Sequence, residues 1–133
     1  MPHIFNGEWW TVILPGGWEA EVEQHGASFH RTPILGTLQI SAARREISEV
    51  TEADLKEFAS ERIAEGHPLV SVRLGAFEGF QCDHDAGDLH WSEWWLRHDS
   101  SLVYATYIVP VHKVTDEERS EVEAILKSLA LRV

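Results

Sequence analysis

Apolar and polar residues alternate with a period of two along much of the chain, which is typical of strands that bury one face. In residues 18–23, Trp18, Ala20 and Val22 alternate with three glutamates. The same reasoning predicts further strands over 9–14, 37–45, 69–77, 78–85, 88–99 and 101–112. The segment between the early strands, residues 24–36, carries Gly26, Pro33 and Gly36, and is predicted to be irregular.

Two segments show helical periodicity instead. Within residues 51–66, one helical face gathers Leu55, Phe58, Ala59 and Ile63. In the segment that begins at Thr115, one face gathers Val122, Ile125, Leu126 and Leu129. Thr115 with Glu118 matches the capping box, and Thr51 with Asp54 resembles it with a less preferred acid. We therefore predict one helix in each segment.

The last two predicted strands do not keep a single apolar face. Both alternating faces of 101–112 are largely apolar, which predicts that the sheet is covered on both sides. In 88–99 the alternation fails after Ser92, because Glu93 would share a face with Trp95 while Trp94 would point outward. A bulge near Ser92, cover on both faces, or an exposed Trp94 would each explain this pattern.

Several pieces of the sequence occur in the order known from one fold family. They are V-I-L-P-G-G-W at 12–18, D-L-K-E-F-A at 54–59, L-G-A-F-E-G-F at 74–80, W-x-x-W-W-L at 91–96, V-Y-A-T-Y at 103–107 and E-V-E-A-I-L-K-S-L at 121–129. Taken together, the chain resembles the PsbP-like fold family, which includes photosystem extrinsic proteins, the Ran-binding Mog protein and many small bacterial proteins. The resemblance implies an α+β fold with an antiparallel β-sheet sandwiched between helices (α/β/α), formed by a single domain over residues 1–133.

The same resemblance implies binding rather than catalysis. Members of the family mostly bind other proteins, and one bacterial branch resembles chaperones or accessory factors for secreted effectors. The matched motifs consist of core and turn residues, so they carry over no catalytic residue. The sequence itself contains no G-x-S-x-G, P-loop, H-E-x-x-H or G-x-G-x-x-G motif. We expect no enzymatic activity and no cofactor.

The charge of the chain narrows the class of partner. Twenty-two acidic residues against 11 basic ones give a formal net charge of -11. This charge repels phosphate backbones and anionic membrane surfaces, so we expect neither nucleic-acid binding nor membrane insertion. It is compatible with a basic protein partner, because complementary fields speed association, and equally with a role in solubility alone.

The single cysteine and the first ten residues bear on the cellular compartment in which the protein resides. Cys82 is the only cysteine, which excludes an intrachain disulfide, and its place in an apolar strand pattern favours a small buried residue over a reactive thiol. No apolar run approaches 18 residues, and the first ten residues lack the basic and apolar regions of a secretory signal. We expect a cytoplasmic location.

The stretch from residue 81 to 95 concentrates the candidate chemistry. With Ala86-Gly87 at the tip of a hairpin, Asp83 would pair with His90 and Asp85 with Asp88. The four side chains of Asp83, Asp85, Asp88 and His90 would then share one face, a set that suits Mn²⁺, Ca²⁺ or Zn²⁺. The alternative is a solvated turn in which Asp83 and His90 form an exposed pair without a metal.

The tryptophans are candidates for a binding surface. An exposed tryptophan beside a polar rim is a common binding anchor, and Trp9, Trp10 and Trp94 are the candidates here, with core packing as the alternative.

Three hypotheses follow. The first is a non-catalytic protein-binding module, namely an effector chaperone, an adaptor or an immunity-type factor. The alternative is a metal-binding protein or metal-dependent enzyme that uses the tip at 83–90. A third is a protein that holds a small apolar ligand against the tryptophans.

Overall fold

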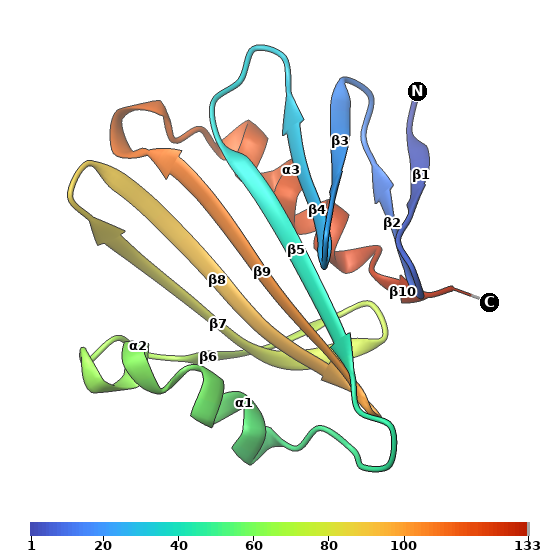
Figure 1. The fold of residues 1–133 in the computed structure, drawn as a ribbon. Helices are drawn as coiled ribbons and strands as arrows, with labels where there is room; N and C mark the ends of the chain where they lie inside the picture. Colours follow the sequence, from blue (N-terminus) through green and yellow to red (C-terminus); the bar gives the residue numbers. More distant parts are fainter. Residues whose placement is uncertain (133) are drawn as a thin grey trace.

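The computed structural model describes residues 1–132, which form two antiparallel sheets and three α-helices (Figure 1). The larger sheet has seven strands in the order β3 (Trp18–Glu23), β4 (Gly26–Arg31), β5 (Thr37–Arg44), β9 (Ser101–Pro110), β8 (Leu89–His98), β7 (Phe77–Ala86) and β6 (Val70–Leu74). The smaller sheet has the order β1 (His3–Asn6), β2 (Trp10–Leu14) and β10 (Ala130–Leu131). The helices are α1 (Glu52–Phe58), α2 (Ser60–Ala64) and α3 (Asp116–Lys127), and a 3₁₀ turn, Val111–Lys113, precedes α3.

The middle of the large sheet is buried on both sides, as the apolar faces of β9 predict. The pairing of β8 with β9 runs without a bulge from Leu89 opposite Pro110 to His98 opposite Ser101. Trp94 and Trp95 point to opposite faces, and they are only 3% and 4% exposed. The failed alternation after Ser92 is therefore explained by cover on both faces.

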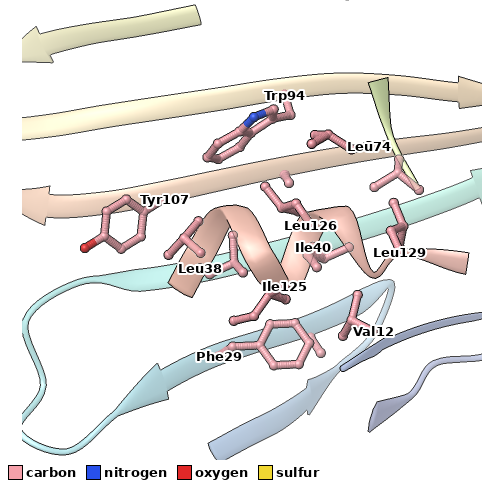
Figure 2. Packing of buried hydrophobic residues seen from close by; sticks show 14 of the residues in the cluster. Val12, Phe29, Leu38, Ile40, Leu74, Trp94, Tyr107, Ile125, Leu126 and Leu129 are labelled. Carbon is pink, nitrogen blue, oxygen red and sulfur yellow. The ribbon is translucent and has the colours of Figure 1, made fainter. Parts of the chain in front are cut away.

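The main core lies between the large sheet, the small sheet and α3 (Figure 2). Ile125 and Leu126 of α3 pack with Phe29 and Leu38 of the large sheet and with Val12 of β2. Each of these side chains is fully buried, and burying one contributes about 1.5–3 kcal/mol. The apolar face of the predicted last helix is confirmed.

The sequence predicts the better capping box at α3, but the structure forms the complete capping box at α1. At α3, Thr115 Oγ1 accepts from the Glu118 amide, but the Glu118 carboxylate does not return to Thr115 and is used in the core instead. At α1, Thr51 and Asp54 form a complete reciprocal capping box. The capping box at α3 is therefore only half formed, because the Glu118 carboxylate accepts hydrogen bonds in the core instead.

A second, smaller core lies on the opposite face of the sheet. Leu55 and Ala59 pack there against Phe80, Cys82 and Trp95. The burial predicted for Cys82 is confirmed, since its side chain is 1% exposed. Burial also raises the pKa of the Cys82 thiol, which keeps it protonated at neutral pH.

The prediction of one continuous helix over 51–66 is wrong at its centre. Ala59 has φ −89° and ψ 5°, so α1 ends at Phe58 and a separate short helix, α2, begins at Ser60. Only Leu55 and Ala59 of the predicted apolar face are buried, whereas Phe58 is 55% and Ile63 is 45% exposed.

The prediction that residues 24–36 are irregular is also wrong, because β4 fills residues 26–31. Gly26 was interpreted as a breaker, but it pairs with Ser41 inside the sheet. A Cβ at Gly26 would lie 1.8 Å from the Ile40 carbonyl oxygen, so glycine is required by the close approach of the two strands. The short strands β1 and β10 were not predicted either.

The fold class α+β is confirmed, but helices cover the large sheet unevenly. One face packs against α3 and the small sheet. On the other face α1 lies over β7 and β8, while β5 keeps Gln39, Ser41 and Ala43 exposed. No helix within residues 1–132 is long and apolar enough to span a membrane. That the chain forms a single domain over residues 1–133 stays a prediction.

Candidate functional site

The hairpin of β7 and β8 closes differently from the prediction. Ala86 pairs with Leu89, so that Gly87 and Asp88 form the turn, and His90 lies opposite Asp85 rather than Asp83. Gly87 has φ +63°, which explains why the glycine takes a position within the two-residue turn.

The predicted metal ligands are not gathered by this hairpin. Asp85 Oδ1 lies 2.7 Å from His90 Nδ1, as a direct pair. Asp83 instead accepts from Gln81 and lies 3.8 Å from Arg119, and Asp88 is at the exposed tip. Residues 1–132 contain no group of three or more histidine, cysteine or acidic side chains that could hold a metal ion. The predicted register is therefore wrong, because His90 pairs with Asp85, and metal binding by Asp83, Asp85, Asp88 and His90 stays a prediction.

Two of the three candidate tryptophan anchors are core residues. Trp10 is 2% and Trp94 is 3% exposed, so neither offers a surface to a partner. Figure 2 shows Trp94 on the core side, near Leu74. Trp9 is half-buried, with the Arg44 guanidinium 4.3 Å from its ring centroid, and its role in binding stays a prediction.

A cavity lies where α1 and α2 meet the sheet. Its volume is about 350 Å³, within the range of small-ligand sites. The cavity is lined by Phe58, Glu61, Arg62, Glu93, Trp95, Leu102 and Tyr104. Phe58 and Arg62, which lie on either side of the helix break at Ala59, both line it, and Arg62 reaches Glu93 of the sheet.

The polar end of this cavity is built around Glu93 of β8. The Glu93 side chain is 3% exposed. Its Oε1 accepts from Arg62 Nε at 2.6 Å, and its Oε2 accepts from the Tyr104 hydroxyl. Arg62 Nη1 also donates to Glu65 at 2.8 Å, so the guanidinium ties α2 to the sheet. Two such donors hold the buried carboxylate in one position.

Two histidines extend this polar cluster away from the cavity. The side chain of His84 is 5% exposed, and its Nδ1 lies 3.6 Å from Glu93 Oε1. Within residues 1–132 this nitrogen has no hydrogen-bond partner. The rings of His67 and His84 are 5.0 Å apart between centroids. Burial, and then the charge of Arg62, lowers the pKa of His84, so the imidazole is neutral at pH 7.

The proton affinities of the cluster do not suit acid–base chemistry near neutral pH. The hydrogen bond to Glu93 raises the pKa of Arg62. Burial, and then the bond to Glu93, raises the pKa of Tyr104 far above its ordinary range. Both groups therefore stay protonated, and they can position a bound group without exchanging protons with it.

A second buried carboxylate, Glu118 of α3, lies on the opposite face of the sheet. It accepts from Arg31 Nε at 3.0 Å, from the Gly36 amide at 2.9 Å and from the Tyr107 hydroxyl. The Glu118 side chain is 0% exposed. This site is a closed part of the core.

Sequence reasoning missed the cavity, although one signal was present. Glu93 was recognised as the residue that spoils the alternation between Trp91 and Trp95. A lone charged residue at a position that should be buried indicates a paired, functional or structural site. Its partners come from α2 and β9, which are distant in the sequence.

Comparison with known structures supports a PsbP-like fold. A crystal structure from Bacteroides thetaiotaomicron VPI-5482 matches with a TM-score of 0.73 and 16% identity, covering 99% of this chain and 48% of that chain. The chain therefore spans about half the length of that protein. The solution structure of cyanobacterial PsbP (CyanoP) from Synechocystis sp. PCC 6803 matches with a TM-score of 0.63 and 10% identity, covering 98% and 92% of the two chains. At these identities the likeness shows the fold alone. No protein-family model and no curated protein matches the sequence.

Proposed function

We propose that this protein is a non-catalytic binding module for another protein, acting as a chaperone, adaptor or immunity-type factor. We assign its binding site to the cavity beside Glu93 together with the sheet surface next to it. This surface, the open sheet face, consists of the side chains on the α1 side of β3, β4, β5 and β9. Its main members are Glu19, Glu21, Glu23, Gln39, Ser41 and Tyr104.

One observation carries the proposal: an apolar-walled cavity opens beside an uncovered part of the sheet, with Phe58 at its rim. Phe58 is 55% exposed although it belongs to α1, the helix that Leu55 anchors to the sheet. Exposed aromatic side chains at the edge of a pocket are typical of protein-binding sites. The walls of Trp95 and Leu102 would receive an apolar side chain of the partner, and Tyr104 and Arg62 would orient it.

The fixed protonation of the polar cluster supports binding over catalysis. Arg62 and Tyr104 keep their protons near neutral pH, and the Cys82 thiol is both buried and protonated. We place the protein in the cytoplasm as part of the same proposal, on the ground that its only cysteine is buried and unpaired. Fractionation of source cells with an antibody to the native protein checks this location.

Affinity capture from a lysate of the source organism tests the site. Phe58→Asp places a charge at the cavity rim, and Ile13→Asp is the matched control, because Ile13 is 49% exposed on the small sheet. We expect one partner to be captured by the wild type and by Ile13→Asp, and lost with Phe58→Asp. Equal capture by all three proteins would exclude the cavity as the site. The absence of any captured protein would contradict a protein-binding function.

A further inference from the structure

We propose that the partner contacts the open sheet face through an extended basic segment, with cationic side chains over β3 and one apolar side chain in the cavity. This inference rests on the proposed function and names the chemistry of the partner. The segment would run across the strands, from the outer edge of the sheet at β3 towards β9.

The charge of the open sheet face calls for a basic occupant. Glu19, Glu21 and Glu23 all point to this face from β3, and all three are exposed. Within residues 1–132 their charged contacts are limited to His30, which lies 3.5 Å from Glu19, and no lysine or arginine pairs with them. Three adjacent carboxylates without a cation attract a basic partner, and the net charge of -11 adds to this field.

A row of polar side chains leads from these glutamates to the cavity. Strand register places Glu21 opposite Ser28, Ser28 opposite Gln39, Gln39 opposite Thr106, and Thr106 opposite Glu93. Ser28 donates to Glu23 and accepts from Gln39 Nε2 at 3.4 Å. The acidic edge and the cavity are thus linked by one row of polar side chains, in which Gln39 is exposed and Ser28 and Thr106 are buried beneath the surface.

The geometry sets the spacing within the partner segment. β3 and β9 are separated by three strand intervals in the sheet order. At ~4.8 Å an interval this is about 14 Å, and an extended chain covers it in roughly four residues. The apolar residue of the segment should therefore follow its basic residues by about four positions.

Titration with synthetic peptides tests the proposal. The probe is a blocked, labelled peptide with three lysines and a leucine about four residues beyond them, measured by fluorescence anisotropy at low and moderate salt. Two further peptides replace the lysines by glutamates or the leucine by serine. The protein variants are Glu19→Gln/Glu21→Gln/Glu23→Gln and the matched control Asp88→Asn/Asp116→Asn/Glu123→Gln, which removes as many exposed charges elsewhere.

We expect the lysine–leucine peptide to bind the wild type and the control, and to bind the β3 variant about tenfold more weakly at low salt. The glutamate peptide should not bind, and the serine peptide should bind more weakly than the leucine peptide. Equal weakening by both triple variants, or no binding of the lysine–leucine peptide, would overturn the proposal.

The two proposals fail in different ways. If a partner is lost with Phe58→Asp but is kept by the β3 variant, the cavity is a binding site and the basic segment is wrong. If the β3 variant loses the peptide while Phe58→Asp keeps both peptide and partner, the acidic surface binds and the cavity does not.

Discussion

Glu93 and Glu118 are two buried carboxylates with nearly the same partners on opposite faces of one sheet. Each accepts from an arginine Nε and from a tyrosine hydroxyl of β9. Glu118 also holds the Gly36 amide and is enclosed by the core. Glu93 instead lies beside a cavity of about 350 Å³ and a His84 nitrogen that has no hydrogen-bond partner among residues 1–132.

The two sites share a carboxylate, an arginine and a tyrosine, and they differ in what surrounds these three groups. A buried ion pair is costly to desolvate, and losing one partner leaves a charge without compensation. At Glu118 all the neighbours are fixed by packing, so the carboxylate connects elements of the core. At Glu93 the same groups border an open cavity, which a side chain of a binding partner could fill.

Removing the enclosed carboxylate should have the largest effect. Glu118→Ala leaves the Tyr107 hydroxyl, the Gly36 amide and the Nε of Arg31 without this acceptor, while Arg31 Nη1 keeps Glu117 and Glu121. We expect the change to cost about 3–5 kcal/mol of unfolding free energy. Urea unfolding followed by tryptophan fluorescence measures this loss. Glu123→Ala is the control on the same helix: its side chain is exposed, and its loss should cost less than about 1 kcal/mol.

Removing the carboxylate beside the cavity should cost less. For Glu93→Ala we expect a loss of about 1–3 kcal/mol, because water in the cavity can solvate Tyr104 and Arg62 after the change. The same urea unfolding experiment compares the two sites directly. A loss equal to that of Glu118→Ala would show that the cavity does not relieve the unpaired groups, and the contrast between the sites would disappear.

Mild acid should lower the stability of the protein through His84, the buried histidine beside Glu93. The folded pKa of His84 is lowered, so below the ordinary histidine pKa of about 6.5 the unfolded chain takes up a proton that the folded protein refuses. Stability should therefore fall as the pH drops below about 6.5, and His84→Gln should flatten this part of the profile. Melting temperatures across this pH range test it, with the exposed His112→Gln keeping the wild-type profile.

The rim of the cavity should contribute least to stability. Phe58→Ala removes a side chain that is more than half exposed, and we expect a change within about 1 kcal/mol. Thermal unfolding checks this value. A loss of several kcal/mol would mean that Phe58 is a core residue, and that the binding defect expected of Phe58→Asp reports misfolding.

Sequence patterns predicted correctly those strands and helices in which the spacing of apolar residues alone decides which side chains are buried. The faces of β9 and the buried stripe of α3 could be found because each residue's environment follows from its position in one element. The break at Ala59 and the strand beginning at Gly26 could not, since local preference there favours a helix and a turn, and tertiary contacts decide otherwise. Glu93 stood out, but its partners depend on how distant elements meet.

The two tyrosines of β9 also have a consequence for folding. Tyr104 and Tyr107 are an odd number of residues apart, so the strand directs one hydroxyl to each face and each reaches its own carboxylate. A slip of β9 by one residue would exchange the faces and leave both carboxylates without this donor. The two hydrogen bonds therefore favour the native register of β9 over registers shifted by one residue.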